Sequence, residues 1–578
     1  MAGKRAKALR TDAAAALTRG HSRAHNSTTP TEQKVTPKRP PARGWFGRGG
    51  GAAVNVEAAP EFRGSTFQVC GLWPFSVGTG APMIGVPLGR HLESRGTVCS
   101  DPISWFQRAK LISNPSVFVL GKPGLGKSTL VRRMVTGLAG YGSIPLVLGD
   151  IRPDYVDLIR ELDGQVIPLG KGRGYLNVLD PGEAHEAAQL LMESASVELA
   201  AAADAEAELA AMERASAGVT DEAALLDMQM QAADLVQVAV KHREKGERAE
   251  GLATEVLEDA HSLRRTMVSA LLAIARGQNP TDREESIINA ALKYLDDHFD
   301  GVPVLRDLLE VIQQAPDEVR LVALDRGSMT RYHEVTDQLE ASLLGLVQGG
   351  RLGDLFSRPT TVRMARDRPV VYDVAPLMHA DPDQQAAVLL ACWSAGFGTV
   401  NVANALAEAG LEPQRHYFVV LDELWRALRA GRGMVDRVDE LTRLNRVEAA
   451  ALAMITHTMS DLMSLRDEAD RSTAQGFVER AGYVICGGLP QREMPLLNTV
   501  INLSRSEQQM LMSWTDPPAW DAEKGEEADP PGRGKFLIKV GGRPGIPVTV
   551  ELTPAEKAPS NTNRLWDTVS RIGERSNA

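Results

Sequence analysis

Apolar residues along this chain fall into short continuous runs, separated by longer stretches with helical spacing. Residues 116–120 (SVFVL) form a β-branched, apolar run typical of a strand buried in a parallel sheet. Helical stretches such as 128–138 and 384–406 separate several of these runs. This alternation predicts an α/β fold with a mainly parallel sheet, covered by helices on both faces. The runs that predict strands are 116–120, 144–148, 165–169, 369–374, 416–421, 451–456 and 482–486.

The middle of the chain has a different pattern. Between residues 183 and 346, Ala- and Glu-rich segments such as 199–212 have strong helix propensity, and we predict a large all-α insertion. A coiled-coil arm is a weaker alternative, because no clean heptad persists over several repeats. Near the C-terminus, residues 535–540 and 546–552 flank a Gly-Gly-Arg-Pro-Gly turn and predict a β-hairpin.

Composition places the chain among soluble globular proteins, with 43% hydrophobic and 24% charged residues in 578. No uninterrupted apolar run reaches the ~18 residues of a membrane span. The N-terminus lacks the apolar core of a signal peptide. We therefore expect a protein without a transmembrane segment that is either cytoplasmic or attached to the inner face of the cell membrane only through partners. The four cysteines form no CxxC pair, which indicates neither a zinc site nor a disulfide framework.

The net charge of -10 hides an asymmetry. The first 50 residues hold eleven Lys and Arg and two acids, a net charge of +9, so the remainder carries -19. This Ser-, Thr-, Pro- and Gly-containing stretch predicts a disordered basic tail. DNA or anionic lipid is a candidate partner for it, and a solvated leader without a partner is the alternative.

The clearest chemical motif follows the strand at 116–120. It matches G-x-x-x-x-G-K-[ST], the phosphate-binding loop, and a helix follows it as required. Glycines allow backbone N–H groups to converge on phosphate oxygens. We expect Lys127 to reach the β- and γ-phosphates of ATP and the Ser128 hydroxyl to bind Mg²⁺. A simple Gly-rich turn would not explain the Lys-Ser pair at this offset. The loop residues are Gly121, Lys122, Pro123, Gly124, Leu125, Gly126, Lys127, Ser128 and Thr129.

A second motif ends the run at 416–421, where Asp422 and Glu423 follow directly. An apolar strand that ends in two acids is typical of a Walker B motif. Asp422 is expected to hold Mg²⁺, and Glu423 to orient or deprotonate the attacking water. The structural alternative is a helix cap at the end of the strand. Two adjacent acids favour hydrolysis over nucleotide sensing alone.

Other polar residues complete the predicted site. Thr456 ends the run at 451–456 and His457 follows it, where ATPases with a RecA-like core place a sensor of the γ-phosphate. Arg443 and Arg446 are candidates for an arginine finger that reaches a neighbouring subunit. A helix cap and solvated surface arginines are the respective structural alternatives. The segment 503–509 faintly resembles an ABC-type signature, but its order along the chain is wrong and it fits a capping box better.

These motifs together resemble the motor domain of conjugative type IV secretion ATPases, within the HerA–FtsK group of P-loop NTPases. The resemblance spans residues 70–566 and includes 177–181, 350–356 and 561–566, the last similar to actinobacterial members. It implies a homo-hexamer and, as partners, components of a membrane secretion complex. Many relatives have Gln at the position of His457. Relatives often carry a larger N-terminal docking domain, and coupling proteins carry N-terminal membrane helices, which favours the secretion ATPase here.

The predicted fold is therefore a RecA-like P-loop NTPase with a mainly parallel sheet, a large all-α insertion and a C-terminal β-hairpin. The main functional hypothesis is an ATP-hydrolysing motor for conjugative DNA or protein transfer. One alternative is a DNA translocase or coupling-type ATPase that contacts DNA through the tail or a central pore. Another is a nucleotide-switched assembly scaffold. The predicted segments are the basic tail (1–60), the first core part (61–182), the helical insertion (183–346), the second core part (347–555) and a C-terminal tail (556–578).

Overall fold

The computed structural model describes the chain from residue 83 to residue 557, apart from short internal gaps. The predicted basic tail, most of the predicted C-terminal tail, and both Arg443 and Arg446 lie outside the described residues. The gaps are 349–351, 430–434, 436–437, 440–448, 466, 519, 522–525 and 528.

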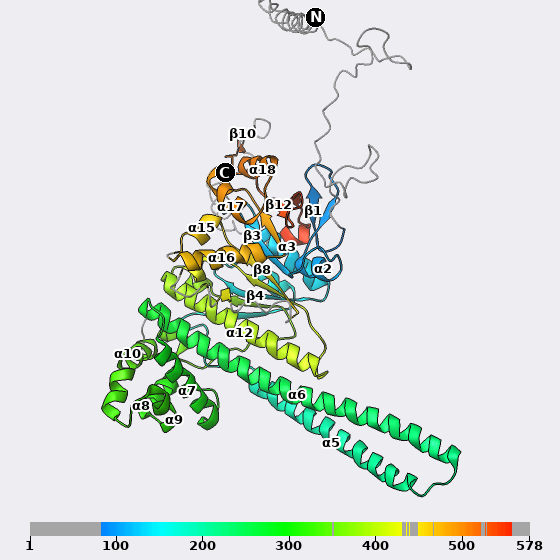
Figure 1. The fold of residues 1–578 in the computed structure, drawn as a ribbon. Helices are drawn as coiled ribbons and strands as arrows, with labels where there is room; N and C mark the ends of the chain where they lie inside the picture. The colour runs from blue at the N-terminus through cyan, green and yellow to red at the C-terminus, as the bar shows by residue number, and fades with distance from the viewer. Residues whose placement is uncertain are drawn as a thin grey trace, which may run out of the picture. The chain divides into compact units, whose positions relative to one another are not determined.

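One mixed sheet organises the described chain (Figure 1). It has eleven strands in the order β2-β1-β13-β12-β9-β3-β8-β7-β4-β6-β5. Neighbours from β9 to β5 are parallel, whereas β12, β13, β1 and β2 extend the sheet antiparallel from β9. The predicted fold class is thus confirmed. The strands are β1 (Pro87–His91), β2 (Thr97–Cys99), β3 (Ser116–Leu120), β4 (Ile144–Asp150), β5 (Gln165–Pro168), β6 (Val370–Asp373), β7 (Tyr417–Leu421), β8 (Ala450–Ile455), β9 (Tyr483–Cys486), β12 (Lys535–Lys539) and β13 (Ile546–Val550), with a separate pair, β10 (Trp520–Asp521) and β11 (Glu526–Glu527).

Side chains of the central strands alternate between two cores. In β3, Phe118 and Leu120 enter one core, whereas Val117 and Val119 enter the other. Because helices cover both faces, every residue of β3 and β7 is buried, which explains the continuous apolar runs. The first core is closed by α12 (Pro382–Glu408), α13 (Leu424–Leu428), α15 (Met459–Met463), α16 (Glu468–Arg480), α17 (Met494–Val500) and α18 (Arg505–Ser513), and the second by α2 (Pro102–Gln107), α3 (Lys127–Gly140) and α4 (Val156–Glu161).

Helix α12 is the one described helix that is long and apolar enough, by length and composition, to cross a membrane. In this fold, 78% of the most apolar 18-residue stretch of α12 is buried. The helix packs against β4 and α13. Its apolar side chains are therefore part of the hydrophobic core on one face of the sheet.

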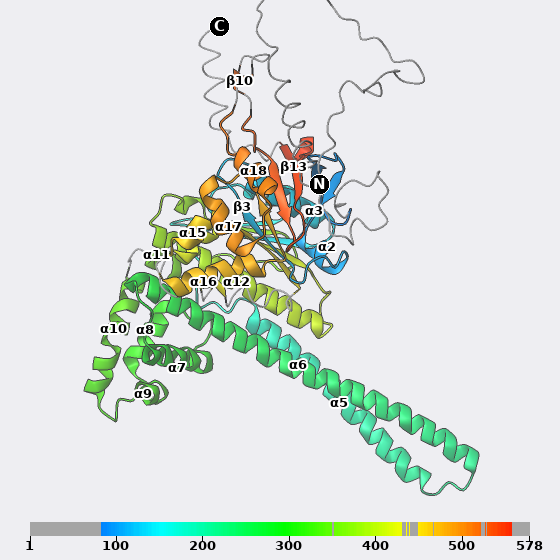
Figure 2. The same ribbon diagram turned by 45° about the horizontal axis from the view of Figure 1, so that its top comes forward.

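Two long helices form an arm that projects from the sheet (Figures 1 and 2). Helix α5 (Ala184–Ser216) runs outward, and α6 (Glu222–Arg276) returns along it. At the inner end, side chains of both helices, including Leu191 and Leu252, share a core with Val402 and Leu406 of α12. The arm is therefore anchored on the helix that covers the sheet.

The seam of the arm is built from small residues. Its buried positions include Ala195, Ala202 and Ala205 on α5, and Ala239 and Gly246 on α6. Small side chains let the helix backbones approach closely, and they do not produce the large apolar heptads of a standard coiled coil. The sequence predicted an all-α insertion with a coiled-coil arm as the weaker alternative; α5 and α6 are helices of that insertion and pair with each other as an arm.

The remaining helices between α6 and β6 form a small bundle. Tyr332 is fully buried in it and its hydroxyl donates to the carbonyl of Ile312 over 2.6 Å. A capping box of Thr281 and Glu284 begins the first of these helices. They are α7 (Asp282–His298), α8 (Leu305–Gln314), α9 (Asp317–Ala323) and α10 (Met329–Val347), and the short α11 (Gly353–Phe356) follows.

Candidate nucleotide-binding site

The predicted phosphate loop connects β3 to α3 and is braced by three other segments. The N–H of Gly121 donates to the His457 carbonyl (2.9 Å), and the N–H of Lys122 to that of Gly488 (3.0 Å). The N–H of Gly534 donates to the Leu125 carbonyl (3.0 Å). Gly124 and Gly126 have φ values of 81° and 96°, in the left-handed region that favours glycine. The loop is thus held from β8, β9 and the start of β12.

Lys127 is buried inside this loop, with 8% of its surface exposed. Its Nζ donates to the Gly121 carbonyl (2.6 Å) and lies 3.1 Å from His457 Nδ1. Burial lowers the pKa of Lys127 to about 8, against the opposing effect of Asp422 and Glu423. A desolvated ammonium of this kind gains strongly from a phosphate anion.

Asp422 directly follows β7 and lies among other acids. Its Oδ1 accepts the N–H of Glu423 (2.8 Å), and its Oδ2 accepts the Tyr155 hydroxyl (3.4 Å). Burial, reinforced by the charge of Glu423, raises the pKa of Asp422 to about 7. Burial also raises the pKa of Asp150 and of Asp154. A bound cation would offset the cost of burying several carboxylates close to one another.

The donor chemistry fits Mg²⁺, which prefers oxygen ligands. The Ser128 side chain, at the start of α3, opposes the rise in the pKa of Asp154, so a hydroxyl and carboxylates meet beside the loop. Among the described residues, no three or more His, Cys, Asp or Glu side chains are grouped so that they could hold a metal alone. Ser128 and Asp422 would therefore share the ion with phosphate oxygens and water.

Glu423 has a left-handed backbone, with φ 54° and ψ 35°, and is largely buried. Its Oε2 accepts the indole N–H of Trp425 (2.6 Å) and lies 3.5 Å from Arg426 Nε. Its Oε1 lies 3.7 Å from an Arg152 nitrogen. The carboxylate is therefore surrounded by donors and cations.

His457 bridges the two motifs. Its Nδ1 faces Lys127, and its Nε2 lies 3.5 Å from Glu423 Oε2. Since an ammonium can only donate, Nδ1 is the acceptor and Nε2 carries the hydrogen that points at Glu423. Burial, together with the Lys127 charge, lowers the pKa of His457, which favours this neutral form. The hydroxyl of the neighbouring Thr456 is buried and finds no hydrogen-bond partner within the described chain.

Residues at the end of β4 also contribute to the site, although the sequence did not predict them there. Asp150 ends this strand and accepts the N–H groups of Asp154 (3.2 Å) and Tyr155 (2.7 Å). These residues approach the phosphate loop because β4 pairs with β7. The available signal was the polar run that follows the predicted strand at 144–148, since parallel strands end at the same edge.

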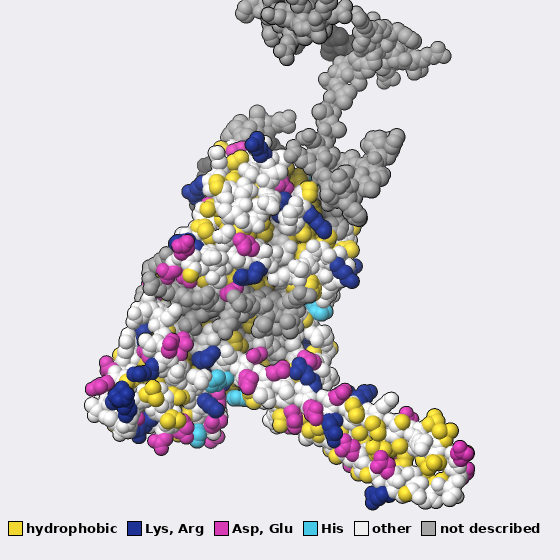
Figure 3. Space-filling view, in the orientation of Figure 1, with side chains coloured by type: hydrophobic (Ala, Val, Ile, Leu, Met, Phe, Trp, Pro, Cys, Tyr) yellow, Lys and Arg dark blue, Asp and Glu magenta, His cyan; other side chains and the backbone are white. Residues whose placement is uncertain are grey.

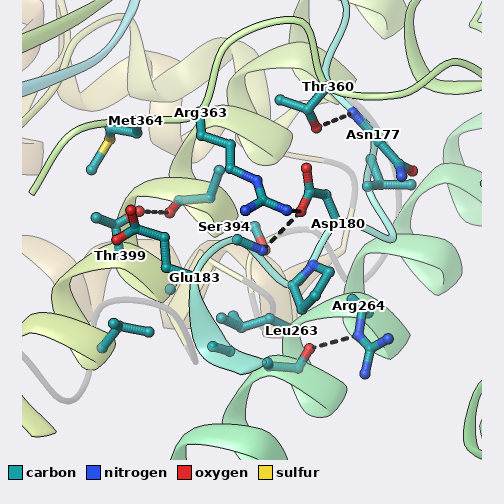
Figure 4. A pocket seen from close by; sticks show the side chains of 18 of the residues that line it. Asn177, Asp180, Glu183, Leu263, Arg264, Thr360, Arg363, Met364, Ser394 and Thr399 are labelled. Carbon is teal, nitrogen blue, oxygen red and sulfur yellow. Dashed lines mark hydrogen bonds and ion pairs between the residues drawn. The ribbon is translucent and has the colours of Figure 1, made fainter. Parts of the chain in front are cut away.

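A separate cavity of about 850 Å³, its open mouth included, lies where the arm joins the core (Figure 4). Figure 4 shows Arg363 reaching toward Asp180, and their nearest side-chain atoms are 3.5 Å apart. Arg363 also pairs with Glu186 of α5 over 3.0 Å. Asn177 and Asp180, from the segment that resembles the secretion ATPases, line this cavity, whereas the phosphate-loop residues do not.

The sequence matches no family model and no curated protein. Among solved structures, VirB4 of Thermoanaerobacter pseudethanolicus matches with a TM-score of 0.52 and 17% identity. The match covers 83% of this chain and 99% of that chain. This chain has the fold of VirB4. The fold that the sequence motifs implied is thereby confirmed.

The bacterial conjugative coupling protein TrwB is more distantly similar. Its complex with sulphate matches with a TM-score of 0.39 and 11% identity, over 76% of this chain and 86% of that chain. Its complex with an ATP analogue, ADPNP, matches with a TM-score of 0.39 and 12% identity, over 77% and 87% of the two chains.

Proposed function

We propose that this protein is an ATP-hydrolysing motor. The observation that carries the proposal is the contact chain from Lys127 through His457 to Glu423, with separations of 3.1 and 3.5 Å. These residues follow β3, β8 and β7, which are adjacent in the sheet. A phosphate-binding lysine, a polar side chain at a strand end and a carboxylate at one edge suit hydrolysis of a nucleoside triphosphate.

Each residue has a role in this proposal. Loop N–H groups and Lys127 bind the β- and γ-phosphates, and Ser128 and Asp422 hold Mg²⁺, which would neutralise phosphate charge. Glu423 orients the attacking water and takes its proton as the water oxygen bonds to the γ-phosphorus and ADP leaves. His457 contacts both Lys127 and Glu423, and it therefore couples phosphate binding at Lys127 to the position of the Glu423 carboxylate.

The cellular role that we propose is conjugative transfer of DNA or protein through a type IV secretion system. It rests on the resemblance of the sequence motifs to those secretion ATPases. In this role the chain acts as a homo-hexamer with components of a membrane secretion complex, at the inner face of the cell membrane. Arg443 or Arg446 reaches the nucleotide of a neighbouring subunit.

A direct DNA translocase is the second candidate. The observation that favours it is the charge of +9 on residues 1–50, which suits a polyanion. In this case DNA would contact the tail or a central pore of the ring.

Steady-state ATPase activity of the full chain, with and without DNA across a salt series, tests both proposals. We expect Mg²⁺-dependent hydrolysis that falls at least ~100-fold in Glu423→Gln, since a positioned base contributes up to ~10⁴. Indifference to DNA supports the secretion motor, and stimulation that fades with salt supports the translocase. An unchanged rate in Glu423→Gln would remove Glu423 from the mechanism, whereas no hydrolysis in the wild type would overturn the motor and favour a nucleotide-switched scaffold.

A further inference from the structure

Trp425 lies in the first turn of α13, two residues after Glu423 and four after β7 ends at Leu421. Its indole N–H donates to Glu423 Oε2 over 2.6 Å. The left-handed backbone of Glu423 makes the turn that leads into α13 and the indole. The proposed base and its hydrogen-bond donor therefore belong to one short turn.

The indole ring itself contacts two cationic side chains. Guanidinium groups of Arg426 and Arg429 each lie 4.8 Å from its centroid, a cation–π distance. Arg429 also bonds to Ser464 (2.6 Å) and to Asp461 (3.1 Å), which ties this side to α15. The ring therefore has little freedom to leave Glu423.

The contacts to the Glu423 carboxylate differ in kind. The indole nitrogen is at hydrogen-bond distance, whereas Arg426, Arg152 and the neutral His457 are at 3.5 to 3.7 Å, too far for a well-formed hydrogen bond. An indole N–H is a neutral donor that never accepts a proton. It can fix the direction of the carboxylate and leave lone pairs free to take a proton from water.

We propose that Trp425 is a positioning residue that aims Glu423 at the attacking water. This inference rests on the proposed ATP hydrolysis and deepens it. Because a misdirected base affects the chemical step and not the phosphate contacts, Trp425 sets kcat and leaves nucleotide affinity nearly unchanged. Misplacement of a reacting group by about 1 Å costs ~100-fold in rate, which bounds the effect.

The first test is Trp425→Phe in the full chain. We expect kcat to fall between ~10- and ~100-fold, with the affinity for a fluorescent ATP analogue within about twofold of wild type. The matched control is Trp393→Phe on α12, which also removes an indole N–H, one without a hydrogen-bond partner within the described chain. Thermal midpoints of both variants exclude a folding defect. A kcat within twofold of wild type, or a parallel loss of affinity, overturns the proposal.

The second test is a double-mutant cycle with Glu423→Gln. If Trp425 acts through the carboxylate, Trp425→Phe causes no further loss once Glu423 is replaced. Multiplying losses would show that the indole acts elsewhere. Failure of the broader proposal is recognised separately, because the wild type would then hydrolyse no ATP, and failure of the proposed role of Glu423 because Glu423→Gln alone would leave kcat unchanged.

Discussion

At the residue scale, Lys127 is the cation on which nucleotide binding should depend. The rest of its loop contributes mainly backbone groups, and the side chain of the neighbouring Lys122 is exposed. Two lysines in one loop thus have different surroundings, and only one is buried against the predicted phosphate position.

Lys127→Ala should therefore weaken ATP binding by at least ~30-fold, the lower range for removal of one buried partner of a charge pair. Titration with a fluorescent ATP analogue measures this loss. Lys122→Ala is the matched control and should bind as the wild type does. Wild-type affinity in Lys127→Ala would contradict the phosphate-loop assignment.

Asp422 should make stability depend on pH when nucleotide and Mg²⁺ are absent. Its pKa is raised from 3.8 to about 7, so the folded chain binds a proton that the unfolded chain has released. Its contribution to stability is then greatest below about pH 4 and falls as pH rises toward 7.

Asp422→Asn should accordingly raise the thermal midpoint more at pH 8 than at pH 5, measured in a chelator by scanning calorimetry. Added Mg²⁺ and ATP should restore the advantage of the wild type. An equal change at both pH values would show that the carboxyl titrates normally in the folded chain.

The sequence predicts residues of the site where spacing encodes the chemistry, as in Gly121 to Thr129 and Asp422 with Glu423. It does not reveal Asp154 or Trp425 as neighbours of that chemistry. Asp154 arrives through the pairing of β4 with β7, and Trp425 through the left-handed turn at Glu423. Both depend on tertiary geometry, which no local pattern records.

At the element scale, the seven core strands and the two hairpin strands were predicted to within about two residues at each end, because runs such as SVFVL are buried on both faces. The short strands β1, β2, β10 and β11 were not individually predicted. The capping box of Ser504 and Glu507 at the start of α18 is also confirmed. The arm was undervalued because its seam uses alanine and glycine. Helical propensity predicts that such helices form and says little about what they pack against.

Two glycines of α6 allow a test of this seam. A Cβ at Gly246 would lie 2.6 Å from Leu199 Cγ, whereas a Cβ at Gly251 would meet only the end of the Arg248 side chain, 4.0 Å away. Gly246→Ala should therefore make the arm easier to cleave, because overpacking costs ~1–3 kcal/mol. Gly251→Ala should protect it, because alanine favours a helix over glycine by ~1 kcal/mol.

Limited proteolysis with detection of cleavage in the arm compares these variants, and ATP binding reports that the core is intact. Opposite effects of the same substitution would support close helix packing. Equal protection by both would mean that Leu199 moves aside and that the seam is loose.

At the scale of the whole molecule, the phosphate loop collects segments from across the chain. Besides β3 and α3, it contacts residues after β8 and β9 and Gly534 before β12. The C-terminal hairpin thus supports a loop that lies about four hundred residues earlier in the chain.

Assembly should be visible in mixtures of inactive variants. Lys127→Ala subunits keep their arginines, whereas Arg443→Ala or Arg446→Ala subunits keep their phosphate loop. If either arginine acts on a neighbouring subunit, mixing Lys127→Ala with the corresponding arginine variant should restore ATPase activity. Titration of one variant into the other measures the recovery. An arginine variant that remains inactive in every mixture acts within its own subunit.

The arm also has a mechanical consequence. With 55 residues, α6 is roughly 80 Å long, and its inner end is seated beside α12, which packs on the sheet that carries the phosphate loop. Its outer part exposes apolar side chains such as Leu226 and Met230 (Figure 3). A tilt of about 10° at the seat would carry the far end through roughly 14 Å, given that length. A small rotation where the arm meets α12 would therefore produce a much larger displacement at the outer end of the arm.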